Sequence, residues 1–350
     1  MMESGMVDKS TAKRLVDEMI SNLPKHNRQQ RPVHTIGVGV DAYFTASDVA
    51  RKFCIAEHFS GERICAKVRF SNASGGPEQH DGWNDVRGMA TRFLLPSGAA
   101  TDLIATTLRE FFARNVEDFF EFTKLDKHKP YRRESPWRKI LDMLQLKIPR
   151  RDPYPGEETN ASAGILNYAN RHRFAQLGVA EFKKIGAPVS YARAAYHAIH
   201  TFIVEGENEV RRPVRFSWQP VAGVGNTNPD APPVDDYLRQ ELEGRLQRWP
   251  ARFVLMMTIG EAGDAIDDPT RPWPARRVRI VMGTLTLTGV PEDQATAGEQ
   301  ISFNPLRLVR GIEPSADPIL HARRDAYEVS REMRGGTACP FSHRSCADGE

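Results

Sequence analysis

Residues 34–46 read HTIGVGVDAYFTA, and this stretch points most directly to a fold. It has the extended pattern of a β-strand, yet Gly37 and Gly39 lie inside it. Glycine weakens a strand, and its presence in one indicates that another backbone or a flat ligand approaches closely. We therefore expect a strand that lies against such a neighbour.

Further segments have strand patterns. They lie at the start of 64–76, in 86–98 and 101–106, in both arms of a hairpin at 195–221, and in 251–262 and 275–289. With 34–46 this makes about eight strands, most of them joined as hairpins. Helical patterns come before, between and after them. The arrangement predicts an α+β protein whose core is an antiparallel barrel, or a strongly curved sheet, with helices outside.

The expected helices follow from apolar periodicity and from capping residues. They cover 10–23, 47–58, 108–125 with Thr107 as a possible cap, a helix opened by Ser135-Pro136, 162–184, 232–249, and 317 to about 334.

Composition argues against several classes of protein. The 350 residues carry a net charge of only +3, with basic and acidic residues mixed and no basic stripe, so we expect no binding to nucleic acid. No stretch approaches the roughly 20 apolar residues of a membrane span. The N-terminus lacks the apolar run of a signal peptide, so the expected compartment is the cytoplasm. No glycine-rich phosphate loop follows a predicted strand, which disfavours a nucleotide enzyme.

The four cysteines, Cys54, Cys65, Cys339 and Cys346, are irregularly spaced and predict neither a disulfide framework nor a zinc site. We expect an N-terminal helical arm at 1–27, one domain at 28–335 and a flexible tail at 336–350. The tail either carries spare thiols or offers Cys and His ligands to a metal.

The segment 303–334 carries the most informative chemistry. Arg323 and Tyr327 are four apart on a predicted helix and share a face. A guanidinium beside a phenol favours its charged form, and a phenolate can ligate ferric haem. Asp317 can cap the helix and reach an Arg one or two turns away. A surface Arg packed on a half-buried Tyr would give the same spacing.

Two other residues suggest a site near the first strand. His34 precedes the glycine-spaced strand, and histidine can move a proton between the two oxygens of a peroxide. The same His could equally be a satisfied core or surface residue. Arg69 lies in VRFS (68–71), and an inward Arg needs an anionic partner. That partner is either a haem propionate or a protein carboxylate.

Taken in order, these segments resemble the haem-dependent catalase family. The likeness includes R-x-V-H-x-x-G-x-G-x-x-x-Y-F at 31–44, V-R-F-S at 68–71 and D-x-R-G-x-A at 85–90. It continues with DPTRPWP at 268–274, GTLTLT at 283–288 and a pattern from Phe303 to Tyr327. It spans roughly residues 10–335, and the chain ends soon after the Tyr helix. It therefore resembles the small catalase-related peroxidases and implies a catalase-like eight-stranded barrel.

The resemblance implies one haem b, bound through a tyrosine near the C-terminus. Tyr327 would be the axial ligand, and Arg323 would keep it as phenolate. His200 and Asp317 would support that Arg. The haem propionates would be held by three residues: Arg31, Arg69 and Arg334.

On the peroxide side, the resemblance implies that His34 is the acid–base and that Ser71 supports its other ring nitrogen. Phe119 would pack near the haem, and Phe111 would line the same pocket. One position departs from the family: Thr106 stands where the family has an Asn. A Thr hydroxyl is shorter than an amide, which makes efficient disproportionation of hydrogen peroxide doubtful.

The expected function is therefore reduction of hydrogen peroxide or an organic peroxide with a small organic electron donor, with weak catalase activity and a role in oxidative stress. One alternative is a fatty-acid hydroperoxide enzyme resembling allene oxide synthase. Val33 argues mildly against it, because coral allene oxide synthases place a Thr there. Another alternative is a haem carrier or sensor. A homo-oligomer is possible, and the sequence identifies neither the donor nor an NADPH site.

Overall fold

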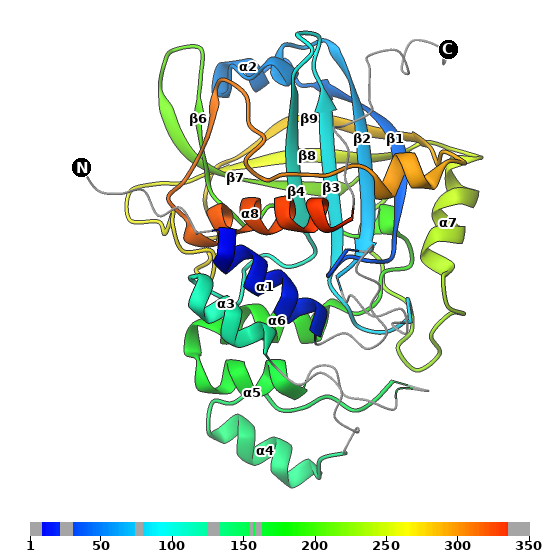
Figure 1. The fold of residues 1–350 in the computed structure, drawn as a ribbon, viewed down its shortest axis with the longest axis vertical. Coiled ribbons are helices and arrows are strands. Elements are labelled where there is room, and N and C mark those ends of the chain that lie inside the picture. Colours follow the sequence, from blue (N-terminus) through cyan, green and yellow to red (C-terminus); the bar gives the residue numbers. More distant parts are fainter. Residues whose placement is uncertain are drawn as a thin grey trace.

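The computed structural model describes residues 9–21, 31–73, 80–124, 133–154, 157 and 163–334. Within these ranges it contains eight strands that pair into a closed antiparallel barrel, in the order β1–β2–β3–β4–β5–β7–β8–β9 and back to β1 (Figure 1). The predicted catalase-like barrel is confirmed. Its strands are β1 (Gly37–Ala46), β2 (Arg63–Asn72), β3 (Arg87–Leu94), β4 (Ala100–Thr106), β5 (Tyr196–His197), β7 (Arg211–Pro220), β8 (Ala251–Ile259) and β9 (Arg279–Gly289).

One wall of the barrel is interrupted. β5 and β6 (Phe202–Glu205) pair with successive parts of β7, so they form one broken strand. Residues 198–201 lie in the break, and β10 (Ile312–Pro314) pairs with β6 outside it. In the break, the amide of Ala198 still donates to the carbonyl of Phe216 at 2.9 Å, and residues 199–201 leave the ladder. His200, one of the predicted site residues, lies there.

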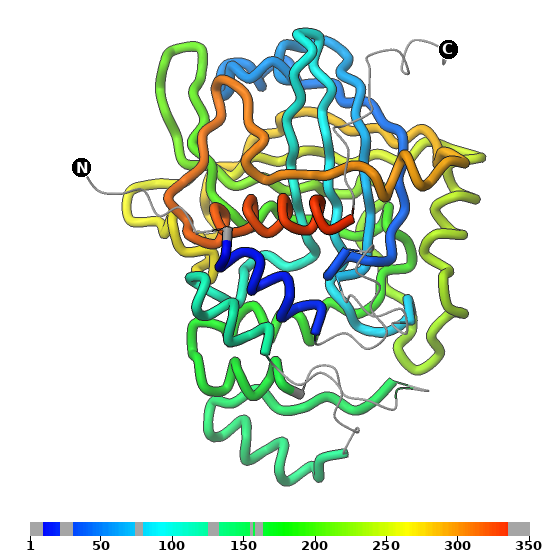
Figure 2. Tube along the Cα trace, in the orientation of Figure 1, coloured from blue at the N-terminus to red at the C-terminus, as the bar shows by residue number. Residues whose placement is uncertain are grey.

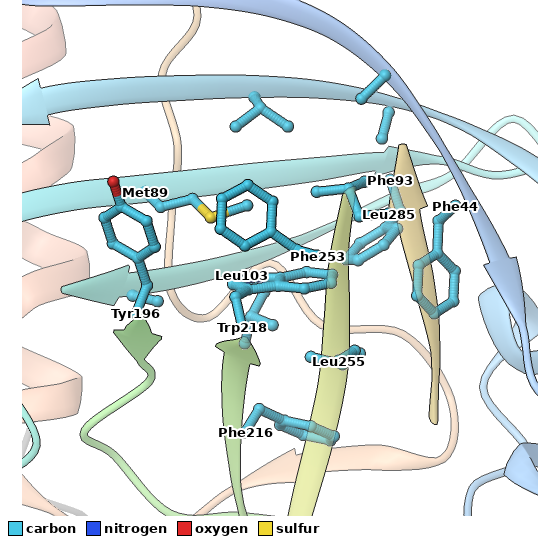
Figure 3. Packing of buried hydrophobic residues seen from close by; sticks show 14 of the residues in the cluster. Phe44, Met89, Phe93, Leu103, Tyr196, Phe216, Trp218, Phe253, Leu255 and Leu285 are labelled. Carbon is cyan, nitrogen blue, oxygen red and sulfur yellow. The ribbon is translucent and has the colours of Figure 1, made fainter. Parts of the chain in front are cut away.

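Side chains fill the barrel interior (Figure 3). Phe44 meets Phe93 and Trp218 edge-on, with ring centroids 5.3 Å and 6.2 Å apart. Edge-on contacts of this kind add to the burial of the rings themselves. A cavity of about 20 Å³ remains beside His58, Phe93 and Leu103. The interior is thus a packed core, and any large ligand must lie outside the barrel wall.

The outer face of β1–β4 carries a row of small and polar residues. Gly37 is paired with Ser71, Ser71 with Gly88, and Gly88 with Thr106. Directly paired residues of antiparallel strands point to the same face. Phe70 and Met89, their neighbours in β2 and β3, belong to the interior core. We call these four residues, Gly37, Ser71, Gly88 and Thr106, the outer row.

The close neighbour predicted at Gly39 is a backbone. A Cβ at Gly39 would lie 2.3 Å from the carbonyl oxygen of Ala297, in the single π-helical turn η4 (Ala295–Glu299). Gln294 fixes this approach, since its side chain accepts from the amide of Gly39 at 2.7 Å and donates to its carbonyl at 3.0 Å.

The helices surround this barrel. They are α1 (Lys9–Ser21), α2 (Ala50–Phe53), α3 (Val116–Thr123), α4 (Pro136–Leu144), α5 (Ala163–Arg171), α6 (Gln176–Ile185), α7 (Tyr237–Leu246) and α8 (Pro318–Met333), with 3₁₀ turns η1 (Glu57–Phe59), η2 (Arg173–Ala175) and η3 (Tyr191–Arg193). The first and last helices lie together although they are at opposite ends of the described chain (Figure 2). Ala12 and Val16 of α1 and Val329 of α8 form a buried cluster. None of the described helices has the length and apolar character needed to cross a membrane.

The expected helix at 108–125 is wrong in its first half. The hydroxyl of Thr107 accepts from the amide of Arg87 at 3.0 Å, so it caps no helix. The amide of Phe111 donates to the carbonyl of Pro269 at 2.8 Å, and such long-range bonds replace the first helical turn. Helix α3 begins only at Val116, where Asn115 accepts from the amide of Asp118 at 2.8 Å.

Other boundaries also differ from expectation. The helix predicted at 47–58 is reduced to α2 and η1, and the one at 162–184 is divided by η2 into α5 and α6. Helix α7 has no side-chain hydrogen bond from its N-cap residue, Asp236, and Asp81 instead accepts from the amide of Leu238 at 3.1 Å. The helices opened by Ser135-Pro136 and Asp317-Pro318 begin as predicted.

Two cysteines lie in the described ranges. Cys54 is a buried free thiol, and Cys65 is disulfide-bonded, which the irregular cysteine spacing did not predict. The tail with Cys339 and Cys346 lies outside the described residues. The domain boundaries at 27/28 and 335/336 stay predictions.

Candidate functional site

The first part of the site is a buried chain of polar side chains that begins at the N-terminus of α8. Asp317 caps this helix, with one carboxylate oxygen accepting from the amide of Ile319 at 2.9 Å. Its other oxygen lies 2.7 Å from Nδ1 of His200. Nε2 of His200 lies 2.8 Å from Nη1 of Arg323, and Nη2 of Arg323 donates to the hydroxyl of Tyr327 at 3.2 Å.

The order of donors in this chain follows from charge. Burial lowers the pKa of His200, while the Asp317 carboxylate raises it, and the net direction is downward. A neutral ring that donates from Nδ1 to Asp317 must accept at Nε2, and Arg323 can only donate. The chain thus fixes the guanidinium of Arg323 with its second amino group on the phenol of Tyr327.

The second part is a group of three guanidiniums around Glu299. Arg69 reaches Glu299 Oε1 at 2.8 Å, and Arg31 lies 3.6 Å from Oε2. Arg334 donates to the backbone carbonyl of Glu299 at 2.9 Å. Burial, followed by repulsion from Arg69 and Arg334, lowers the pKa of Arg31 well below its ordinary value. Glu299 supplies one negative charge against the three positive charges of Arg31, Arg69 and Arg334. These four side chains together therefore carry an excess of positive charge.

The third part is His34, which lies on the outer row. Its Nδ1 is 2.9 Å from Oγ of Ser71, and its carbonyl accepts from Arg69 at 3.0 Å. Burial lowers the pKa of His34 to about 3, aided by the charges of Arg69, Arg323 and Arg31. The ring is therefore neutral near pH 7. Its backbone has a φ of 57°, a left-handed conformation that costs a non-glycine residue on the order of 1 kcal/mol.

Gly88 holds the space beside this ring. A Cβ added at Gly88 would lie 2.9 Å from Cε1 and Nδ1 of His34 and 2.9 Å from Oγ of Ser71. Real Cβ atoms essentially never come so close, so a side chain at this position would have to displace the ring or the hydroxyl. Neither Gly88 nor Glu299 was singled out from sequence. Gly88 could have been noticed only through its place in the motif at 85–90.

Thr106 ends the outer row. Its hydroxyl makes two weak contacts with Leu108, at 3.3 Å to the amide and 3.4 Å to the carbonyl. It is paired with Gly88 on one side and with His197 on the other. Burial lowers the pKa of His197 to about 4. His197 was not singled out from sequence either.

The two aromatic residues lie together. The rings of Phe111 and Phe119 are 5.6 Å apart, within a cluster that includes Phe112 and Phe122. Helix α3, which carries Phe119, contacts α8.

The parts are joined by charge and contact into one region. Arg69 contacts both His34 and Glu299. The charge of Arg323, on α8, helps to lower the pKa of His34. The structure therefore brings the predicted residues together between the outer row and α8, with Phe111 and Phe119 in the aromatic cluster beside α8.

These residues fit a haem by their own chemistry. Nε of Arg69 is buried and has no hydrogen-bond partner among the described residues, which suits an anionic group such as a propionate. The outer row offers a face with few bulky side chains, and Tyr327 offers a phenol oxygen with a guanidinium beside it. A flat, doubly anionic ligand that accepts an oxygen ligand matches all three features.

Comparison with known proteins agrees with this geometry. The family model described as Catalase matches residues 12–149 and 151–340. The chain is 32% identical over 308 residues to a catalase-related peroxidase of Mycolicibacterium paratuberculosis, covering 87% of this chain and 89% of that one. It is 30% identical over 311 residues to a catalase-related peroxidase of Synechococcus elongatus, covering 88% and 84%.

Solved structures support the fold. A fungal catalase matches with a TM-score of 0.69 at 21% identity, and a bacterial catalase with 0.70 at 21% identity. Each match covers 88% of this chain but only 60% and 58% of those catalases. With its barrel closed in this order and the family model matched over nearly its whole length, the chain belongs to the catalase family.

Proposed function

We propose that this chain is a small haem-dependent peroxidase that reduces hydrogen peroxide or an organic peroxide with an organic electron donor. Membership of the catalase family and the two catalase-related peroxidases make it an oxidoreductase that acts on peroxide. The single observation that carries the proposed haem dependence is the buried chain from Asp317 through His200 and Arg323 to Tyr327.

Tyr327 would ligate the haem iron, while Arg31, Arg69 and Arg334 would hold the propionates and Phe111 and Phe119 would contact the ring. The proposed haem is of b type, as the resemblance to the catalase family implies, and the sequence has no C-x-x-C-H motif for covalent attachment. When bound, the haem supplies the redox chemistry that cleaves the O–O bond.

On the α8 side, the task of the protein is to present an oxygen ligand of fixed charge. Arg323 stabilises negative charge on the hydroxyl of Tyr327 from 3.2 Å. His200 holds Arg323 in place, and Asp317 holds His200. Because His200 and Asp317 are both buried, water does not compete for these contacts. Held in this way, Tyr327 would present its oxygen to the iron.

On the barrel side, His34 would move the proton. Its pKa of about 3 keeps it neutral, so it can take a proton from one peroxide oxygen and return it to the other. In the tautomer that donates from Nδ1 to Ser71, Nε2 is the nitrogen that exchanges this proton. Ser71 and Gly88 would fix the orientation of the ring, and this orientation decides which oxygen receives the proton.

Thr106 supports ranking donor oxidation above disproportionation. Its hydroxyl faces Leu108, and it is too short to replace the family's Asn as a donor to a second peroxide. We therefore propose weak catalase activity beside the peroxidase activity. An oxidative-stress role, a cytoplasmic location and a homo-oligomeric state stay predictions.

The test is to load the purified protein with haem and add hydrogen peroxide while following oxygen release and oxidation of a reporter donor together. Donor oxidation with little oxygen supports the proposal. Rapid oxygen release would make it a small catalase instead. Haem binding with neither signal would contradict both and would direct the next assay to fatty-acid hydroperoxides.

A further inference from the structure

Helix α4 exposes its apolar residues to solvent. No residue of this helix is buried, and Trp137 is 80% exposed, Leu141 53% and Leu144 76%. Together with Ile140, at 42%, they recur at helical positions i, i+3, i+4 and i+7, which places them in one stripe. Met143 and Leu146 add further exposed apolar surface beside it.

An ordinary surface helix turns its apolar side chains toward the protein, whereas α4 exposes them to solvent. Polar residues of the segment face the protein. Lys139 is the less exposed partner of an ion pair with Asp152 at 2.8 Å, and Glu134 is the less exposed partner of one with Arg150 at 3.4 Å. Beyond the helix, the amide of Ile148 donates to Asn170 of α5 at 2.8 Å. These contacts fix the apolar stripe outward.

The helix is well formed despite this exposure. Ser135 accepts from the amide of Arg138, Pro136 occupies the first turn, and Leu146 ends the segment in a left-handed conformation with a φ of 56°. Figure 1 shows α4 at one end of the molecule, with α5 and α6 between it and the barrel. Binding at α4 would therefore leave the candidate site uncovered.

The described segment around α4 is basic. Residues 133–151 contain six Lys and Arg against two Asp and Glu, a net charge of +4, while the whole chain carries only +3. The remainder of the chain is therefore net −1. An exposed apolar stripe within a basic segment is the pattern of helices that lie in the headgroup region of anionic membranes.

We propose that α4, with the described basic residues of 133–151, binds the surface of an anionic lipid bilayer, with Trp137, Leu141 and Leu144 in the headgroup boundary. A second copy of the chain is the less suitable occupant, because a symmetric contact through α4 would bring two segments of net charge +4 together. A bilayer with anionic headgroups satisfies both the apolar stripe and the positive charge.

The experiment is flotation of the purified full-length protein with vesicles of phosphatidylcholine alone or phosphatidylcholine with phosphatidylglycerol. We expect binding to the anionic vesicles that weakens as salt is raised, and little binding to the neutral ones. Trp137→Ser should weaken partitioning by about tenfold. Trp249→Ser is the matched control, since Trp249 is 76% exposed after α7 and far from the stripe, and it should bind normally.

A charge variant tests the electrostatic half. Arg138→Gln with Lys147→Gln should weaken binding roughly fivefold for each charge removed. Failure to bind anionic vesicles, equal effects of the two Trp variants, or binding that ignores lipid charge would each overturn the proposal. So would a dimer in size-exclusion chromatography that Trp137→Ser converts to monomer while vesicles stay unbound. Donor oxidation with a water-soluble reporter should be unchanged in Trp137→Ser, which separates this test from that of the proposed function.

Discussion

Arg323 lies 2.8 Å from Nε2 of His200, although the two residues are 123 positions apart in the chain. The contact forms because the barrel strand is broken between β5 and β6, and the break turns His200 toward the N-terminal half of α8. The Arg-x-x-x-Tyr spacing is common, but here His200 holds one amino group of Arg323 while the other amino group donates to the hydroxyl of Tyr327.

Tyr327→Phe should abolish or severely weaken haem binding, because phenylalanine offers no oxygen ligand. Haem titration followed by absorbance measures this. Tyr43→Phe is the matched control, since Tyr43 also lies beside a guanidinium, with Arg63 3.6 Å from its ring centroid, but outside the candidate site. An unchanged haem spectrum in Tyr327→Phe would refute the axial assignment.

His34→Ala should keep the haem but slow the reaction with peroxide by roughly 10²-fold, the contribution usual for general acid–base catalysis. Stopped-flow absorbance after mixing with hydrogen peroxide measures the rate. The pKa of about 3 means that His34 is neutral throughout neutral pH and gains a proton only in strong acid. The His34-dependent part of the rate should thus be flat near neutral pH and fall only in acid. A full-speed reaction in the variant would remove His34 from the mechanism.

Gly88→Ala should slow the same reaction while leaving haem affinity nearly unchanged. The new Cβ would lie 2.9 Å from the His34 ring and from Oγ of Ser71, so the ring must move. Gly289→Ala, also at a barrel strand, adds a Cβ that meets nothing within 4 Å and should react normally. Equal rates for the two variants would show that the position of Gly88 does not orient His34.

Stability should fall in acid because of buried neutral histidines. Burial lowers the pKa of His58 to about 3, whereas an unfolded His has one near 6.5. The unfolded state therefore binds the proton first, and stability that is complete above pH 6.5 is lost toward pH 3, by roughly 1.4 kcal/mol per pH unit for each such group.

His58→Phe isolates this effect. The ring stacks on Phe93 with centroids 4.7 Å apart, and a cavity of about 20 Å³ lies beside it. Its Nδ1 has no hydrogen-bond partner in the part of the chain that the structure describes. A phenyl ring can occupy this space without titrating. Urea unfolding midpoints measured from pH 7 to pH 4 should decline less steeply in the variant than in the wild type, and parallel declines would contradict the assignment.

The sequence predicted those features that depend on local pattern. Asp317-Pro318 marked the start of α8. The expectation of an inward Arg69 was wrong, because Phe70 takes the interior face of β2 and Arg69, paired with Gly39, lies on the outer face. Features that depend on register or on distant partners were missed. The spacing of Thr107 and Glu110 is typical of a helix cap, but the hydroxyl of Thr107 accepts instead from the backbone amide of Arg87. No local pattern shows that Gly88 meets His34, because strand register alone brings them together.

Thr106→Asn should raise oxygen release relative to donor oxidation. An Asn amide is longer than the Thr hydroxyl and has two donors, so it can reach beyond Leu108 toward a peroxide on the His34 side of the outer row. Oxygen electrode and donor absorbance readings on one sample give the ratio directly. Thr107→Asn, one residue along, is the control, since the Thr107 side chain bonds Arg87. An unchanged ratio in Thr106→Asn would mean that this position does not limit disproportionation, and the preference for donors would then have to come from access to the site.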